Sequence, residues 1–514
     1  MGKQRHITLS DEQTGMIDPL QRGHLRRILN LAAQLPDDWS GMMARTSLQE
    51  DFGAYRFQLA YMAYALALTH VHRLTAAPGY FRRPFQRLID KMRSPDVWTY
   101  WHYVSTGNGP LNNAQGELPS EWNPIIKDNI MYSAYLQSMA LLYHYLFNDD
   151  RYARKGALSL VFQPLFWGSE KRYEYDERSL NEHIYWSMVE RGYLGIACEP
   201  NCVFQICNQV PILGFRLHDL VYGGDIAGEV TQGYLKAWSE FGVLNGNGHF
   251  NMMVMEEERV VVTPEAPWAD FWLGSLMHAW NADFVKASFP RQIARWARPG
   301  PDGTRWIMPP DMMEANEDLA SARDFGWAAV CASEVGDLDT RDRLLAYADA
   351  YLHSRWTDGG YHYARHDRLY DQDGLFRCMD PHTGNALLAY ARLNVPDGLR
   401  MLYDGPWDQQ HFAAPALDEL PETWDVTAAR FDARHNRLTV RLESNGDGHD
   451  ATLHFTGIWG RGDWQLRLDG EMVASGSADG VEHAADGLTA FRMDQNLVLR
   501  MPARGPVDLV FQWP

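Results

Sequence analysis

Three cysteines, Cys198, Cys202 and Cys207, lie within one stretch of ten residues, and thiols at this density can do chemistry. Pro200 interrupts the backbone early in the stretch, which predicts a loop followed by a helix from about Phe204. A thiolate near a helix N-terminus is favoured by the helix dipole, so one thiol can act as a base or nucleophile and another as an acid. The alternative is that these free cysteines pack as small apolar side chains in the core.

Glu199 and Tyr135 are the other candidate catalytic residues, beside Cys198 and Cys207. Glu199 follows the first cysteine directly, where its carboxylate can act as an acid or orient its neighbours. Tyr135 shares the face of an expected helix with Tyr132, and its phenol can donate a proton to a leaving hydroxyl. The alternative for Tyr135 is a place in an aromatic core stripe.

A metal centre is the remaining chemical possibility. The three thiols and Glu199 can converge on zinc, but their sequence lacks Cys-x2-Cys spacing. His362 and His366 are four residues apart, as ligands on one helix would be, although their glycine-rich and aromatic surroundings predict a strand or loop. We therefore expect a site with no metal and no cofactor.

Aromatic residues make up 12% of the chain, which suits both a core and the lining of an apolar chamber. Polar residues within aromatic loops, such as His249, Asp270 and Asp324, are more often satisfied structural groups than catalysts. We expect the substrate to contact Tyr61, Tyr64, Met131, Phe204, Asn208, His249, Trp268 and Trp272.

The composition is that of an acidic globular protein. Hydrophobic residues make up 46% of the 514 and charged residues 22%, and the net charge is −19. We expect no nucleic-acid partner, because phosphate binding needs clusters of Lys and Arg. No apolar run reaches the ~20 residues of a membrane span, and residues 1–6 are polar rather than the start of a secretory signal. These features predict a cytoplasmic protein.

Helical periodicity dominates the chain as far as residue 395. Short strand-like segments at 250–255 and 260–263 lie in the loops. Antiparallel helices with long loops at one end suit an α/α toroid. Apolar residues recur at helical spacing over 20–35, 55–73, 129–147, 182–193, 204–222, 229–241, 268–284, 319–335, 341–353 and 383–393.

The pattern changes after Pro406, where polar and apolar residues alternate between turns, as in 430–442 and 507–513. This alternation predicts a small antiparallel β-sandwich. The predicted organisation is an N-terminal extension (1–50), a catalytic (α/α)6 barrel (51–404) and a C-terminal β-sandwich domain (405–514).

Two blocks of sequence are similar to linalool dehydratase-isomerase and its relatives. The first runs from Gly195-Ile196-Ala197-Cys198-Glu199-Pro200 to Cys207-Asn208, and the second, residues 123–132, reads Asn-Pro-Ile-Ile-Lys-Asp-Asn-Ile-Met-Tyr. The resemblance implies an (α/α)6 barrel, a homo-oligomer and acid/base chemistry without a cofactor. The implied substrate is an apolar alkenol or terpenoid, which loses water to form a diene or moves its hydroxyl along an allylic system. In that family two cysteines flank the reacting carbons, and Cys198 and Cys207 match them.

Outside the cysteine pair, this chain has different residues at other active-site positions of the family. The family's histidine, a few residues after the Ile-Met-Tyr block, is Tyr135 in this chain. Its N-terminal aspartate and tyrosine, which come from a neighbouring subunit, align with Ala33 and Trp39, with Asp37 and Asp38 nearby. The implied fold does not depend on these positions, whereas the implied reaction does.

Two other functions fit the sequence. A barrel with a C-terminal β-sandwich is common among carbohydrate-active hydrolases and lyases, which need paired carboxylates, here drawn from Glu199, Asp270, Glu314 and Asp324. The third possibility is a ligand-binding or assembly protein that has lost the chemistry. We favour a lyase or isomerase of the dehydratase type acting on a hydroxylated apolar molecule.

Overall fold

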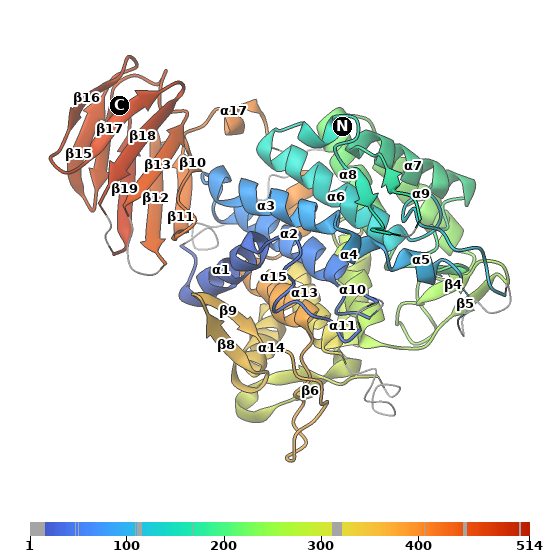
Figure 1. Cartoon of the computed structure of the whole chain (residues 1–514). Helices are drawn as coiled ribbons and strands as arrows, with labels where there is room; N and C mark the ends of the chain where they lie inside the picture. Colours follow the sequence, from blue (N-terminus) through green and yellow to red (C-terminus); the bar gives the residue numbers. More distant parts are fainter. Residues whose placement is uncertain are drawn as a thin grey trace.

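The structure is a computed structural model of the chain, in which a mainly helical part is followed by a strand-rich C-terminal part (Figure 1). It describes residues 16–46, 48–49, 51–107, 109, 116–166, 168–310, 321–405, 407–445, 450–502 and 505–514. No helix among these residues is long and apolar enough to cross a membrane.

One set of helices in the described part of the chain forms a closed sequence of contacts, in which the last helix returns to the first. Most of their residues are buried on every side, which places these helices inside the molecule. They are α2 (Tyr55–His72), α6 (Ile130–Phe147), α8 (Gln209–Tyr222), α10 (Pro267–Met277), α13 (Arg323–Val335) and the π-helical turn η5 (Thr383–Leu387) with α15 (Leu388–Leu393).

Each inner helix packs against a helix of a second set, and these outer helices have partly exposed faces. The helix predicted over 268–284 is in fact two helices, α10 and the outer helix that packs on it, separated by a turn at 278–281. In the order of their inner partners, the outer helices are α3 (Pro78–Met92), α7 (Glu177–Glu190), α9 (Ile226–Trp238), α11 (Ala282–Trp296), α14 (Leu338–Tyr351) and α1 (Pro19–Ala33).

Short helices and antiparallel strands occupy the connections between the main helices. The three-stranded sheet of β3, β4 and β5 follows the cysteine segment, with Val203 opposite Val254 and Val254 opposite Val261. The connecting elements are α4 (Pro95–Trp98), α5 (Trp101–Val104), β1 (Leu160–Phe162), β2 (Lys171–Tyr173), β3 (Cys202–Phe204), β4 (Met253–Met255), β5 (Val260–Val262), β6 (Ala297–Pro299), β7 (Arg305–Ile307), β8 (Ser354–Thr357), β9 (Gly360–Tyr363), α16 (Gly398–Asp404) and α17 (Gln409–Phe412).

The C-terminal region is rich in antiparallel strands, as its alternating sequence predicts. One sheet has the order β10-β13-β18-β17 and the other β11-β12-β19-β14-β15-β16. Burial alternates along β13, β14 and β19, because successive side chains of a strand point to opposite faces. The strands are β10 (Ala416–Glu419), β11 (Trp424–Asp432), β12 (Arg437–Ser444), β13 (Ala451–Thr456), β14 (Trp464–Leu468), β15 (Glu471–Gly476), β16 (Val481–Ala484), β17 (Thr489–Met493), β18 (Asn496–Met501) and β19 (Val507–Gln512).

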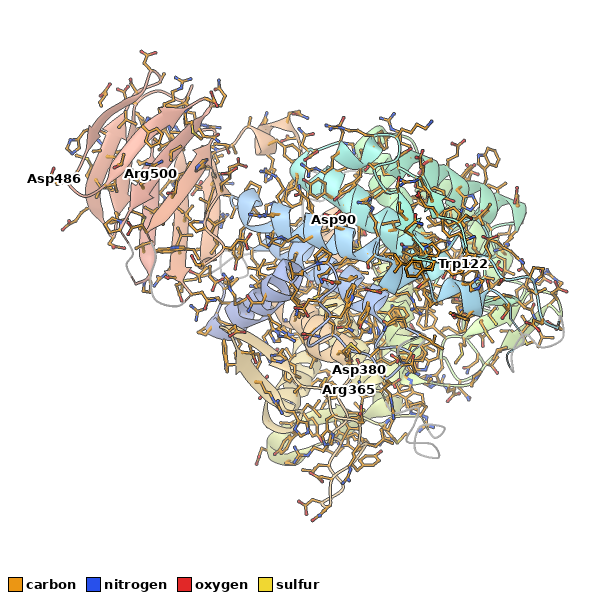
Figure 2. The ribbon with its side chains drawn as sticks, viewed as in Figure 1. Asp90, Trp122, Arg365, Asp380, Asp486 and Arg500 are labelled. Atoms are coloured by element: carbon orange, nitrogen blue, oxygen red, sulfur yellow. The ribbon has the colours of Figure 1, made fainter. Side chains whose placement is uncertain are left out.

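Helices α1 and α3 join the helical body to the strands (Figure 1). Arg26 on α1 donates from Nε to Oδ1 of Asp425 on β11 at 2.9 Å, and the Tyr80 hydroxyl donates to the same oxygen at 2.8 Å. All three side chains are buried. Figure 2 shows the separation of the two regions, with Arg500 among the strands and Asp380 among the helices.

Candidate active site

The loop that carries the cysteine pair is folded back on itself by backbone hydrogen bonds. Cys198 N–H donates to the carbonyl of Cys202 at 2.9 Å, and Cys202 N–H donates to the carbonyl of Glu199 at 2.9 Å. Asn201 takes the left-handed conformation within this turn (φ 70°), which asparagine tolerates better than most residues. The chain then enters strand β3 rather than the predicted helix.

Helix α8 therefore begins only at Gln209, and Asn208 braces the loop before it. The Asn208 side chain accepts from the N–H of Ile196 at 2.8 Å and donates to the carbonyls of Ile196 and Phe204 at 3.0 and 2.8 Å. This brace holds the two arms of the loop together and brings Cys198 beside Cys207. Asn208, expected to contact the substrate, directs its side chain to the loop backbone through these three hydrogen bonds.

The two thiols differ in their surroundings, since Cys207 is buried and Cys198 is half-buried. Burial, together with the neighbouring Cys198 sulfur, raises the pKa of the Cys207 thiol well above its usual value. Burial also raises the pKa of Glu199, against the opposing effect of the Arg56 charge. The helix dipole alone predicts a thiolate, but burial outweighs it at Cys207 and raises the pKa of this thiol.

A backbone hydrogen bond ties the first cysteine to the start of α6, and side chains from separate segments support this contact. Asn129 N–H donates to the carbonyl of Cys198 at 3.1 Å, and the Tyr100 hydroxyl donates to Oδ1 of Asn129 at 2.5 Å. The Arg56 guanidinium lies 4.2 Å from the ring centroid of Tyr100 and 4.4 Å from that of Phe57. The sequence did not single these residues out, because their roles depend on contacts between distant segments.

Tyr61 is the centre of an aromatic cluster beside the thiols. Its hydroxyl accepts a hydrogen bond from Nε1 of Trp272 at 2.8 Å and another from the Tyr135 hydroxyl at 3.1 Å. All three side chains are buried, and burial raises the pKa of Tyr61 and of Tyr135, which a negative charge on Cys207 would raise further. Both phenols are therefore protonated at neutral pH, and three residues predicted for the site meet here.

Three residues that sequence reasoning missed complete the aromatic cluster. The ring centroid of Tyr61 lies 4.6 Å from that of Trp327 and 5.6 Å from that of His382, and Phe57 stacks on His382 at 5.6 Å. These residues, like Tyr135 and Trp272, lie near the starts of their helices. The first two turns of α2, α6, α10 and α13 therefore contribute side chains to this cluster.

A known family matches this part of the chain. The family model described as linalool dehydratase/isomerase matches residues 56–369, more than half of the chain. The chain belongs to the linalool dehydratase/isomerase family. The match spans both cysteines, Tyr61, Tyr135 and Trp272, whereas His382 and the C-terminal strands lie outside it.

This family member is also similar to solved structures of other enzymes. Unsaturated glucuronyl hydrolase from Bacillus sp. GL1 is 12% identical, with a TM-score of 0.40 over 76% of this chain and 97% of that one. An α-mannanase from Bacteroides thetaiotaomicron is 12% identical, with a TM-score of 0.41 over 73% and 97%. An endoglucanase from Clostridium thermocellum is 9% identical, with a TM-score of 0.37 over 96% and 92%. The family assignment rests on the family model.

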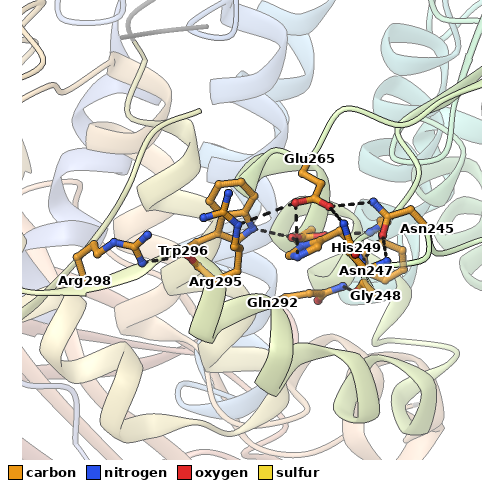
Figure 3. A network of polar contacts seen from close by, with 11 residues as sticks. Asn245, Asn247, Gly248, His249, Glu265, Gln292, Arg295, Trp296 and Arg298 are labelled. Carbon is orange, nitrogen blue, oxygen red and sulfur yellow. Dashed lines mark hydrogen bonds and ion pairs between the residues drawn. The ribbon is translucent and has the colours of Figure 1, made fainter. Parts of the chain in front are cut away.

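His249 lies in a polar network of its own in this linalool dehydratase/isomerase family member (Figure 3). Its Nδ1 hydrogen-bonds to Asp270 at 2.6 Å, and Nε1 of Trp296 donates to the same carboxylate at 2.8 Å. The hydrogen bond to Asp270 raises the pKa of His249, and Oε2 of Glu265 lies 3.9 Å from Nε2 of the ring. The network braces a loop against α10 and α11.

The other expected substrate contacts lie at different depths. Tyr64 is buried one turn beyond Tyr61 with a centroid separation of 5.8 Å, and burial raises the pKa of Tyr64 to about 12. Met131 is buried on α6, and Trp268 is buried at the start of α10. Phe204 is half-buried in β3. Of these side chains, Tyr64 has a direct ring contact with Tyr61.

The carboxylates considered for a carbohydrate-active site have different surroundings. Asp270 belongs to the His249 network, and Oδ1 of Asp324 accepts from the N–H of Trp268 at 2.8 Å. Burial raises the pKa of Asp324 to about 6. Glu314 lies outside the described residues. Among these candidates, Glu199 is placed beside the cysteine pair.

Two further predictions concern ligands and the N-terminal segment. Within the residues that the structure describes, no group of three or more His, Cys, Asp or Glu side chains could hold a metal ion. His362 lies in strand β9, as its surroundings predict. Trp39 stacks on Tyr55 at 4.1 Å and donates from Nε1 to Asp96 at 2.9 Å. It therefore packs against the start of α2 in its own chain.

Proposed function

We propose that this protein catalyses the loss of water from, or the migration of a hydroxyl in, a hydroxylated apolar molecule such as an alkenol or terpenoid, without a cofactor. The proposal keeps the predicted organisation, an (α/α)6 barrel over 51–404 between an extension (1–50) and a β-sandwich domain (405–514). It also keeps the predicted cytoplasmic homo-oligomer.

The observation that supports this reaction is a buried, protonated thiol paired with a half-buried one beside an aromatic cluster. Acid-catalysed water loss needs a proton donor for the leaving hydroxyl and an acceptor for the proton lost from carbon. Cys207 donates its proton as the C–O bond breaks and water leaves. The Cys198–Glu199 pair, which enters the step with one negative charge, receives the proton from the adjacent carbon as the C=C bond forms, and transfer of that proton to Cys207 restores the acid.

The aromatic cluster suits the cationic carbon that forms between these two steps. The faces of Tyr61 and Trp272 attract positive charge through their ring electrons, and buried surroundings keep water from trapping the cation. The Tyr135 hydroxyl donates to Tyr61, so we assign Tyr135 a positioning role through that residue. The proposal thus uses all four candidate catalytic residues, with one acid, one acceptor and two supporting groups.

Single substitutions of the cysteines test the reaction. The wild type is incubated with tertiary allylic alcohols, 2-methylbut-3-en-2-ol and linalool, and dienes and isomers are measured by gas chromatography. We expect Cys198→Ala and Cys207→Ala to lower turnover by at least about 100-fold. Cys331→Ala, at a buried cysteine of α13, is the matched control and keeps the rate within about threefold. Wild-type turnover in both active-site variants would refute the proposal.

A further inference from the structure

Two buried polar atoms of the aromatic cluster have no hydrogen-bond partner in the described part of the chain. They are Nε2 of His382 and Nε1 of Trp327. Both side chains are fully buried, at 0% exposure. Folded proteins pair nearly all buried polar groups, because an unpaired one costs its full desolvation energy. Other buried nitrogens in the described chain are also unpaired, among them Nε2 of His70 and Nε1 of Trp464. What distinguishes Nε2 of His382 and Nε1 of Trp327 is that their rings adjoin each other beside Tyr61.

The unpaired nitrogen of His382 can only accept a hydrogen bond. Nδ1 of this ring lies 3.1 Å from the carbonyl oxygen of Phe52, which can only accept, so Nδ1 carries the hydrogen. Burial lowers the pKa of His382 to about 3, so the ring is neutral at physiological pH. Nε2 is therefore a bare lone pair, and its orientation is fixed by the Phe52 contact.

The unpaired nitrogen of Trp327 can only donate, because an indole has no acceptor atom. Its ring is held by stacking on Trp272, with centroids 4.9 Å apart and planes 11° apart. The centroids of Trp327 and His382 are 6.0 Å apart. A single oxygen can bridge the two nitrogens where they lie within about 5.8 Å of each other, the sum of two hydrogen bonds of about 2.9 Å.

We propose that His382 and Trp327 form a hydroxyl-binding subsite for the substrate. The substrate's O–H donates to Nε2 of His382, and its oxygen accepts from Nε1–H of Trp327. A free alcohol satisfies both nitrogens, an ether or ketone satisfies Trp327 alone, and an alkene satisfies neither. The inference rests on the proposed function and narrows its substrate class to free alcohols.

The subsite adjoins the proposed acid through Tyr61. The Tyr61 ring contacts both Trp327 and His382, and a charge on Cys207 acts on the Tyr61 phenol. His382 also immediately precedes η5, and π-helical turns are frequent at functional sites. The leaving hydroxyl is thereby held beside the thiol that protonates it.

Each member of the subsite has a matched control elsewhere in the chain. His382→Asn keeps a side-chain N–H for the Phe52 carbonyl but lacks Nε2. His70 is the matched control, because its Nδ1 lies 3.0 Å from the Leu74 carbonyl and its buried Nε2 has no partner among the described residues. It lies near the C-terminal end of α2, whereas Tyr61 lies in the N-terminal half of that helix. Trp327→Phe removes the indole N–H, and Trp464 on β14, whose Nε1 is also unpaired in the described chain, is the control.

Calorimetric titration of the whole protein with linalool and with its O-methyl ether tests the subsite. We expect the wild type to bind the alcohol at least about tenfold more tightly than the ether. His382→Asn should reduce this preference to less than about twofold, and Trp327→Phe should weaken both ligands. His70→Asn and Trp464→Phe should retain the wild-type preference.

Several results would overturn the inference. If the wild type binds the alcohol and the ether equally, or binds neither, His382 and Trp327 do not recognise the substrate hydroxyl, and their nitrogens pair only with water. Retained preference in His382→Asn removes that residue from the subsite, and where this variant does not fold, the wild-type preference and Trp327→Phe decide. Alcohol preference without turnover would refute the proposed reaction and leave the subsite standing, so the two failures are distinguishable.

Discussion

Replacing Tyr61 with phenylalanine removes one oxygen that accepts two hydrogen bonds. The change leaves the Trp272 indole N–H and the Tyr135 hydroxyl without their acceptor in a buried site. An unsatisfied buried donor costs about 1–3 kcal/mol, so we expect Tyr61→Phe to lower the free energy of unfolding by about 2–4 kcal/mol. Tyr135→Phe removes only a donor, and its expected cost is about 0.5–1.5 kcal/mol.

The double variant gives the sharper test. With both hydroxyls gone, only the Trp272 N–H stays unpaired, so the double variant should cost less than the sum of the two single ones, by about 1 kcal/mol or more. Unfolding is followed by circular dichroism at 222 nm, which reports the helical body. Tyr132→Phe, which removes one hydrogen bond of 3.0 Å to the Met92 carbonyl, is the control and should cost less than Tyr61→Phe, because only one buried group loses its partner. Additive effects, or equal costs for Tyr61→Phe and Tyr135→Phe, would refute the shared acceptor.

Two further predictions concern buried carboxylates. Burial raises the pKa of Asp324 from the ordinary value to about 6, so its contribution to stability is present below about pH 4 and is lost as the pH rises through 6. Asp324→Asn keeps an acceptor for the Trp268 N–H, so its free energy of unfolding should vary less between pH 4 and 6 than that of the wild type. At pH 7 the variant should be more stable than the wild type by up to about 3 kcal/mol. A pH dependence as steep as that of the wild type contradicts this. Asp425→Asn leaves the buried Arg26 guanidinium without its carboxylate and should cost about 3–5 kcal/mol, measured by thermal unfolding. The exposed Asp339→Asn control should cost less than about 1 kcal/mol, and equal losses would show that burial does not matter at Asp425.

The sequence predicted the inner helices better than the outer ones. Inner helices are apolar all round, so their periodic signal is strong, as over 55–73 and 129–147. Helices α3 and α11 were missed because Pro84 and Pro290 resemble helix ends, although both prolines lie inside their helices. The late start of α8 at Gln209 follows from strand pairing at Val203, which local sequence does not encode.

In the candidate site, too, some residues could be predicted from the sequence and others only from the structure. Cys198 and Cys207 stand out in the sequence because thiols are rare and these two match a family pattern. His382 and Trp327 do not, because their interest lies in unpaired nitrogens and in ring contacts between separate helices. A π-helical turn has no recognisable period either, so nothing local marks the position of His382.

Helix α1 is held in place in part by residues that are synthesised much later. Nε2 of Gln21 donates to the carbonyl of Arg392, 371 positions away, and the N–H of Ile17 donates to the carbonyl of Thr427. At roughly 5–20 residues per second, synthesis of that interval takes about 20–70 s. During this time α1 can pack against α3, but the surfaces of β9, α15 and β11 that complete the burial of Leu25 and Ile28 are not yet made. Part of the apolar face of α1 therefore stays uncovered in the nascent chain until β11 is synthesised, which favours binding by chaperones that shield such surfaces.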